Sequence, residues 1–275
     1  MTKALSAETF RLAVEKGVAT VTLDRPDTLN SLTFEVYAEL RDLFAEMNHH
    51  DDIRAVVLTG QGRGFCSGGD VNSIIGKLFS YDMAGLLAFT RMTGELIANI
   101  RKLRKPVVAA LNGLAVGAGA VMAIACDFRV ASETAKLGFI FPKVGLSGAD
   151  MGAAYLLPRL VGLSKATELL FLGDVIDAAE ALRIGLYHHV VAPNDCLPRA
   201  RALADRLARG PAFAHSMTKE MLEAEGPMSL DEAVEAEAQA QAICMQHPDF
   251  RKAFDAWKKK EAIVFSGAPA PFEVS

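Results

Sequence analysis

The chain has 275 residues, 51% of them hydrophobic and 23% charged, which excludes a wholly disordered polypeptide and allows a sizeable folded core. Its formal net charge of −4 leaves no basic footprint, so nucleic acid and anionic membranes are disfavoured as partners. The four cysteines lack CxxC or zinc-type spacing, so we expect reduced thiols, no metal site and a cytoplasmic protein.

The N-terminal half predicts strands that alternate with helices. Its first residues, MTKALSAETF, contain no apolar segment of a secretory signal. Apolar alternation over residues 10–14 and 21–23 predicts a β-hairpin that turns at Lys16-Gly17. A helix is predicted by the spacing of Leu32, Val36, Leu40, Leu43 and Met47. Continuous apolar runs predict buried strands at residues 55–59, 106–111 and 128–131, and the alternation favours an α/β core.

One uncharged stretch, Val107–Cys126, has the length of a membrane span and contains a GxxxG between Gly113 and Gly117. Pro106, Asn112-Gly113 and the glycines that follow interrupt it. We therefore expect a buried strand, a turn and a helix in this stretch rather than a membrane helix.

The C-terminal part predicts successive helices. Ser164 is expected to cap a helix that stops at Gly173. Capping boxes are expected at Asp177 with Glu180 and at Ser229 with Glu232. We divide the chain into an α/β core over residues 1–197 and a C-terminal helical region over residues 198–275.

Two segments carry the chemistry that the sequence suggests. Gly64–Val71 and Lys105–Gly119 are each a strand that runs into a turn of small residues and then a helix. Backbone N–H groups at a helix start have no partner in the helix and carry partial positive charge. Two such turns side by side could aim two donors at one thioester oxyanion. Tight packing alone is the simpler alternative, and a dinucleotide fingerprint is disfavoured because Gly60, Gly62 and Gly64 do not form GxGxxG.

Four segments resemble the enoyl-CoA hydratase/isomerase (crotonase) family in order and spacing: Arg25–Leu32, Phe65–Asp70, Lys105–Asp127 and Pro158–Gly162. The resemblance implies a spiral of ββα units with a C-terminal helical region over residues 198–275 that forms homotrimers or hexamers. It implies an acyl-CoA thioester as partner and no separate cofactor, because coenzyme A enters with the substrate.

The resemblance also assigns residues to the site. The two oxyanion donors should be the N–H groups of Gly69 and Ala118. Coenzyme A should pass Leu29 and the loop that contains Cys66, Ser67, Gly68, Asp70 and Val71. Asp70 is also expected to cap the helix after the first turn. A lysine that the family usually has beside the adenine is replaced here by Asp27.

Two departures from the family concern the catalytic groups. Hydratases of this family carry one glutamate three residues after the second donor and another after the next strand, where this chain has Val121 and Phe141. Neither side chain can transfer a proton, so a mechanism with two glutamates is excluded. Both residues are expected to line an apolar acyl pocket.

Asp150 is the candidate acid/base. Its position in Gly148–Gly152 is similar to that of a working aspartate in dienoyl-CoA isomerases, hydroxyisobutyryl-CoA hydrolases and chlorobenzoyl-CoA dehalogenases. The alternative interpretation is an N-cap for a helix that begins near Met151. We predict an enoyl-CoA hydratase/isomerase-type enzyme; the alternatives are a hydrolase or dehalogenase-like enzyme that uses Asp150, and a catalytically silent acyl-CoA-binding homologue.

Overall fold

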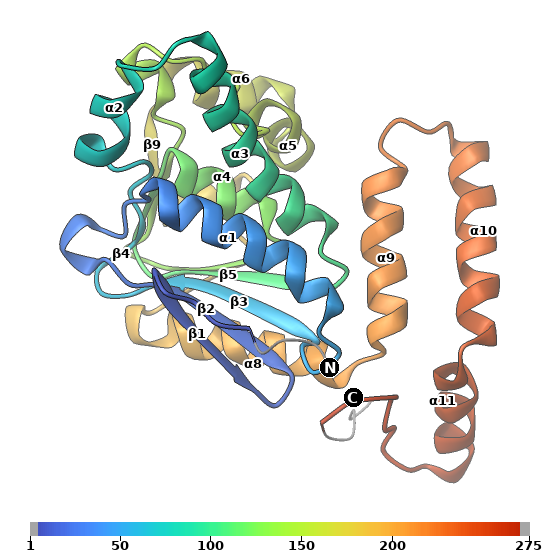
Figure 1. The fold of residues 1–275 in the computed structure, drawn as a ribbon. Coiled ribbons are helices and arrows are strands. Elements are labelled where there is room, and N and C mark those ends of the chain that lie inside the picture. Colours follow the sequence, from blue (N-terminus) through green and yellow to red (C-terminus); the bar gives the residue numbers. More distant parts are fainter. Residues whose placement is uncertain (1–4, 270–275) are drawn as a thin grey trace.

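The computed structural model describes residues 5–269 and contains two sheets (Figure 1). The larger sheet has six strands in the order β1-β2-β3-β5-β7-β10. Only β1 runs antiparallel to its neighbour; the other pairs are parallel. The strands of this sheet are β1 (Phe10–Glu15), β2 (Val18–Leu23), β3 (Ala55–Gly60), β5 (Val107–Leu111), β7 (Phe128–Ser132) and β10 (His189–Val191).

The smaller sheet has four short strands, β4 (Gly64–Cys66), β6 (Leu114–Val116), β8 (Lys136–Gly138) and β9 (Val175–Asp177), in that order. Each of β3, β5 and β7 is followed in the chain by a strand of the smaller sheet. A helix then returns the chain to the larger sheet, as α4 (Ala118–Ala125) does after β5 and β6. This repeated path confirms the predicted spiral of ββα units.

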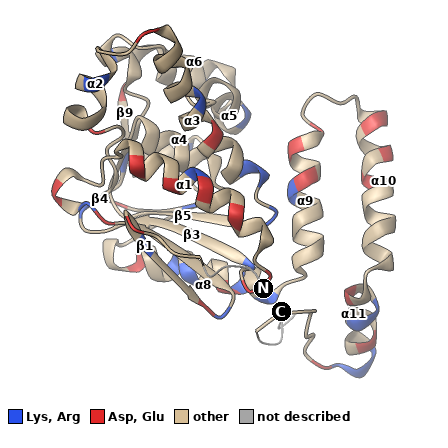
Figure 2. Ribbon diagram, viewed as in Figure 1, with Lys and Arg blue, Asp and Glu red and all other residues tan. Residues whose placement is uncertain are grey.

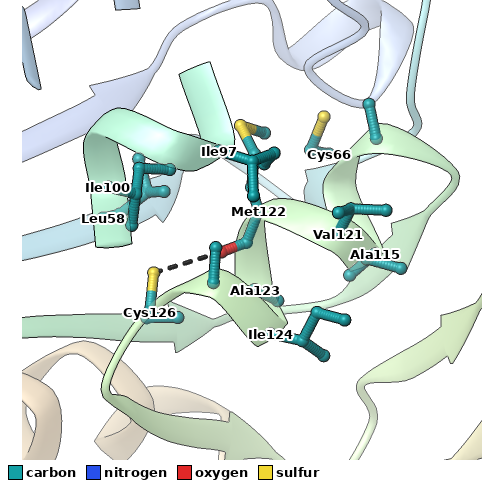
Figure 3. Packing of buried hydrophobic residues seen from close by; sticks show 14 of the residues in the cluster. Leu58, Cys66, Ile97, Ile100, Ala115, Val121, Met122, Ala123, Ile124 and Cys126 are labelled. Atoms are coloured by element: carbon teal, nitrogen blue, oxygen red, sulfur yellow. Dashed lines mark hydrogen bonds between the residues drawn. The ribbon is translucent and has the colours of Figure 1, made fainter. Parts of the chain in front are cut away.

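Helices cover the larger sheet on both faces. On one side lie α1 (Phe34–Glu46), α3 (Met83–Lys102) and α4, which share the main hydrophobic core. In Figure 3 the side chains of α4 lie among Leu58, Ile97 and Ile100. The remaining short helices of the core are α2 (Gly76–Leu78), α5 (Ala153–Val161), α6 (Leu163–Leu172) and α7 (Ala178–Arg183).

The opposite face of the larger sheet is covered by α8 (Cys196–Arg209), seen below the sheet in Figure 1. Its buried alanines Ala200, Ala204 and Ala208 pack against Val57 and Val108. Small side chains at this spacing let a helix approach a sheet closely. The boundary expected between residues 197 and 198 therefore falls inside a helix of the core, and the part that stands apart begins after Arg209.

The C-terminal arm consists of α9 (Ala212–Ala224), α10 (Leu230–Gln246) and α11 (Pro248–Lys259), which project away from the sheets in Figure 1. Ion pairs join α9 to the core: the Lys219 Nζ lies 2.8 Å from Asp127, and Arg101 lies 2.6 Å from Glu223. Because Lys219 is buried, its pairing with Asp127 offsets the cost of removing its charge from water. The arm is thus attached through a polar joint rather than through a hydrophobic core.

Most local predictions are confirmed. The hairpin, the first helix, the three buried strands and the Ser229–Glu232 capping box are present. The Ser164 cap is wrong, because α6 already begins at Leu163 with Gly162 as its N-cap. Asp177 caps α7 through the Glu180 N–H, but the expected capping box is incomplete, because the Glu180 carboxylate accepts hydrogen bonds from Arg183 instead. Within residues 5–269, no helix has the length and apolar character that a membrane crossing requires.

Candidate active site

The two glycine-rich turns are in direct contact. A Cβ atom added to Gly68 would lie 3.2 Å from the carbonyl oxygen of Val116 and 3.6 Å from the nitrogen of Ala118. Gly117 has φ +55°, a conformation that favours glycine, and its N–H donates to the Gly138 carbonyl at 3.0 Å. The strand ends of β4 and β6 therefore bring the two predicted donor residues to one place.

Both predicted donors are free to bind a ligand. Ala118 is the first residue of α4, where a backbone N–H has no acceptor within the helix. Throughout the described residues 5–269, the N–H groups of Gly69 and Ala118 donate no hydrogen bond. The Ala118 N–H also lies at the positive end of the α4 dipole. These two unpaired donors can stabilise an anionic oxygen between the turns.

A polar network holds the first turn. The carboxylate of Asp70 accepts hydrogen bonds from the N–H groups of Asn72 and Ser73 and from the hydroxyl of Ser31. Arg25 lies 3.3 Å from the same carboxylate. The backbone hydrogen bond from Ser73, followed by the bond from Ser31, holds the pKa of Asp70 far below its usual range. The predicted cap is confirmed, although the element that it caps is a single π-helical turn, Val71–Ile75.

The residues expected along coenzyme A are also brought together. The Ser67 N–H donates to the Leu29 carbonyl at 3.0 Å, and the Ser67 hydroxyl donates to the Thr28 carbonyl at 2.8 Å. Leu29 and Asn30 both have positive φ, at 53° and 59°. Consecutive left-handed residues that are not glycine store strain, and such strain is concentrated at functional sites. Leu29, Ser67 and the exposed Val71 thus border one edge of the first turn.

The second turn is bordered by apolar side chains. Val121, on the first turn of α4, is completely buried. Phe141 begins a 3-10 turn, Phe141–Val144, and its ring lies 3.9 Å from where a Cβ on Gly117 would stand. The two positions that carry glutamates in hydratases of the family therefore belong to the main hydrophobic core here.

Asp150 is half-buried and does not cap a helix with its side chain. The first helix after it is α5, whose N-cap is Gly152 and which has no side-chain cap. The carboxylate instead accepts the N–H of Met151 at 2.9 Å. Burial raises the pKa of Asp150, although the Met151 bond opposes this. Met151 has φ +51°, so the carboxylate is held on a strained turn rather than at a helix start.

Tyr37, which the sequence did not single out, lies beside Gly69 of the first turn. The Tyr37 hydroxyl is 3.8 Å from where a Cβ on Gly69 would stand. Burial, with contributions from Cys66 and Asp150, raises the pKa of Tyr37 well above its usual range. Tyr37 occupies the buried face of α1 beside Val36 and was hidden in that apolar pattern.

One cavity of the structure lies away from the two turns. A cavity of about 520 Å³ separates the core from α9 and is lined by residues such as Arg101, Phe128, Tyr155 and Leu222, without either turn. No group of three or more potential metal ligands is present in the part of the chain between residues 5 and 269. The groups at the two turns are thus the free N–H groups of Gly69 and Ala118, the Asp70 carboxylate and the Tyr37 phenol, and we expect the Asp150 carboxylate beside them.

Comparisons with known proteins agree with this arrangement. The family model described as enoyl-CoA hydratase/isomerase matches residues 13–268. The 1,2-epoxyphenylacetyl-CoA isomerase of Escherichia coli (strain K12) is 35% identical over 259 residues, covering 92% of this chain and 97% of that protein. The short-chain-enoyl-CoA hydratase of Clostridium acetobutylicum is 33% identical over 260 residues, covering 92% of this chain and 95% of that protein.

Solved structures show the same likeness. A structure attributed to an enoyl-CoA hydratase of Streptomyces coelicolor A3(2) has a TM-score of 0.93 and 52% identity, and covers 97% of this chain and 98% of that chain. The enoyl-CoA hydratase of Bacillus anthracis has a TM-score of 0.89 and 28% identity, and covers 94% of this chain and 100% of that chain. The relatives include both isomerases and hydratases, so the likeness alone does not select a reaction.

Proposed function

The chain belongs to the enoyl-CoA hydratase/isomerase family, and we propose that it isomerises an acyl-CoA through a thioester enolate, with Asp150 as the acid/base. In this mechanism the thioester oxygen accepts hydrogen bonds from the Gly69 and Ala118 N–H groups. The carboxylate of Asp150 removes a proton from the acyl chain next to the carbonyl and returns it at another carbon.

The contact between the two turns is the observation that carries this proposal. A Cβ on Gly68 would lie 3.6 Å from the Ala118 nitrogen, and Gly69 follows Gly68 directly, which supports a shared acceptor for the two free N–H groups. Removing an α-proton places negative charge on the thioester oxygen, and donors that are already oriented stabilise that charge without reorganising. The dipole of α4 acts in the same direction.

The environment of Asp150 suits proton transfer. A carboxyl whose pKa is raised by burial is a stronger base when ionised, and it holds the proton it has taken until the substrate carbon accepts it. Activity should fall as the pH is lowered through that raised pKa, because the protonated carboxyl cannot accept a proton. The same carboxylate could attack a thioester carbonyl, so hydrolysis and dehalogenase-like chemistry remain alternatives.

Isomerisation is favoured over hydration by the apolar surroundings. Addition of water needs one group to activate water and another to protonate the α-carbon. Val121 and Phe141 supply neither, and both are part of the hydrophobic core. We therefore expect crotonyl-CoA hydration far below the rate of about 10 per second that is ordinary for enzymes.

The test begins with a panel of acyl-CoA thioesters, with crotonyl-CoA among them, incubated with the purified protein and analysed by mass spectrometry. Isomers show no mass change, so chromatographic separation accompanies the mass measurement. On any substrate found, Asp150→Asn should lose two to four decades of turnover, roughly, while keeping its affinity. Asp82→Asn is the matched control, because Asp82 caps α3 through the Gly85 N–H and is exposed.

Full turnover by Asp150→Asn would contradict the proposed role. If no thioester reacts but several bind, the chain is the silent acyl-CoA-binding homologue that the sequence also allowed. Rapid hydration of crotonyl-CoA would show that another pair of groups replaces the glutamates, and isomerisation would then lose its support.

We also propose that the arm assembles the protein into trimers or hexamers. Several apolar side chains of the arm are exposed in the single chain, among them Leu222, Leu230, Val234, Phe250 and Trp257. Exposed apolar surface of this extent marks an interface between proteins. A monomeric mass in light scattering at micromolar concentration would contradict it.

The cytoplasmic location likewise stays a prediction, to be tested by cell fractionation.

A further inference from the structure

The Tyr37 hydroxyl stands beside the first oxyanion donor. It lies 3.8 Å from the position of a Cβ on Gly69, next to Ile74 of the π-helical turn. Adding the covalent geometry of Gly69 puts the hydroxyl within about 6 Å of the Gly69 nitrogen. One acceptor oxygen can bridge two donors over that distance with hydrogen bonds of about 3 Å each.

The ring of Tyr37 is held in a fixed position. It meets the ring of Phe89 edge-on, with centroids 5.9 Å apart and planes at 89°. Phe89 in turn meets Phe34 at 5.3 Å, and Phe34 meets Tyr81 at 6.1 Å. This aromatic cluster joins α1 to α3 and fixes the direction of the hydroxyl, so that little side-chain freedom remains to be lost when a ligand binds.

The hydroxyl has no partner in the protein. Tyr37 is only 3% exposed, yet its hydroxyl makes no hydrogen bond to any residue between 5 and 269. Buried polar groups are normally paired, and an unpaired one requires an explanation. Unlike the Tyr187 hydroxyl, which is unpaired and fully enclosed, the Tyr37 hydroxyl is not sealed off from open space. The Tyr37 oxygen therefore keeps some surface that a ligand group could contact.

We propose, on the basis of the proposed function, that the Tyr37 hydroxyl is the third donor of the oxyanion hole and binds the same thioester oxygen as Gly69 and Ala118. A phenol that stays protonated at neutral pH serves as a donor throughout the reaction. Burial keeps it protonated by raising the pKa of Tyr37.

The test compares two ligands that differ only in the thioester oxygen: acetyl-CoA and S-ethyl-CoA, a thioether without a carbonyl. Their small acyl groups make the test independent of the natural acyl chain. Calorimetry should show that Tyr37→Phe binds acetyl-CoA roughly two- to tenfold more weakly than the wild type, as expected for one neutral hydrogen bond. Its affinity for S-ethyl-CoA should not change.

Tyr81→Phe is the matched control, because it removes a phenol from the same aromatic cluster away from Gly69; it should bind both ligands as the wild type does. The unfolding temperature supplies a second measurement. Tyr37→Phe deletes an unpaired hydroxyl, so its unfolding temperature should be unchanged or higher.

Three outcomes would overturn the inference. Equal affinities of Tyr37→Phe and the wild type for acetyl-CoA would show that the hydroxyl does not reach the oxygen. An equal loss for both ligands would place Tyr37 in coenzyme A binding instead. A marked fall in the unfolding temperature would assign it a structural hydrogen bond. If the wild type binds neither ligand, the proposed function itself fails, and that result is distinct from the other three.

Discussion

The two turns of the proposed oxyanion hole present the same backbone group but are supported in different ways. The first turn is held by charge: the Asp70 carboxylate binds two N–H groups, Ser31 and Arg25, and the π-helical turn that follows exposes Val71. The second turn is held by packing: all eight residues of α4 are buried and none is charged, as its uniform colour in Figure 2 indicates.

This difference suggests a division of labour. A turn that is fixed by hydrogen bonds at the surface can adjust to a ligand at modest cost, whereas a buried helix start keeps its donor in one position. Gly119 illustrates the rigidity, since it is pressed directly against the Cys66 carbonyl of the first turn. We therefore expect the second turn to stay in one position, while the first turn and the ligand adjust to it.

The largest effect is expected where the packing of the second turn is broken. In Gly119→Ala the new Cβ would stand 2.3 Å from the Cys66 carbonyl oxygen, a contact that backbone atoms cannot relieve locally. We expect unfolding free energy to fall by about 3 kcal/mol or more. Gly94→Ala is the control, because Gly94 lies inside α3 with nothing within 4 Å of its Cβ position, and it should gain up to about 1 kcal/mol.

Denaturant titration measures both variants. If the unfolding free energy of Gly119→Ala fell by less than about 1 kcal/mol, the two turns would be free to move apart. The second turn would then not be the rigid one of the two.

The next effect concerns the donor itself. Proline is tolerated at the first position of a helix, and Ala118 holds that position in α4. Ala118→Pro should therefore remove one N–H while the fold survives, and turnover on the substrate from the acyl-CoA panel should fall about a hundredfold or more. Ala118→Gly keeps the N–H and should retain most activity. Comparable turnover in the two variants would exclude Ala118 as an oxyanion donor.

The sequence predicted the second turn better than its surroundings. Val107–Cys126 is uncharged and interrupted by Pro106 and glycines, so local composition alone indicated a buried strand, turn and helix, and the structure confirms it. The Asp70 cap was also readable, because capping depends on residues that are neighbours in the chain. The strands β4, β6, β8, β9 and β10 were missed; each has three residues, too few to show a periodic pattern.

Contacts between residues far apart in the chain limit how much of the site the sequence could predict. Tyr37 belongs to the apolar face of α1, and nothing in its neighbours reveals that its hydroxyl meets Gly69 across the fold. Likewise, the chain around Asp150 allowed a helix cap, which was excluded only when α5 was seen to begin at Ala153. The catalytic assignments of Gly69, Ala118 and Asp150 remain predictions until they are tested in solution.

A smaller effect is expected from the polar support of the first turn. Asp70→Ala removes a cap that binds the Asn72 and Ser73 N–H groups, so the unfolding free energy should fall by about 1–2 kcal/mol. Acyl-CoA affinity should fall as well, because the Gly69 donor loses its neighbouring anchor. Asp82→Ala removes a cap from α3 and should lower stability by a similar amount without changing affinity. Equal affinities in the two variants would mean that the first turn keeps its shape without Asp70.

The smallest expected effect is a difference between the two turns in how their contribution to the unfolding free energy depends on pH. The pKa of Asp70 in the folded protein is far below its ordinary value, chiefly because the Ser73 N–H binds its carboxylate. The stability that Asp70 contributes is therefore complete above the unfolded pKa of about 3.9 and is lost as the pH falls below that value. The advantage of the wild type over Asp70→Asn should therefore be constant near neutral pH and shrink as the pH falls from about 5 to about 2. The stability cost of Ala118→Gly should stay constant over the same range, because α4 contains no ionisable side chain. Denaturant titrations at several pH values measure both differences, and a pH-independent advantage over Asp70→Asn would show that the first turn, like the second, is held by packing.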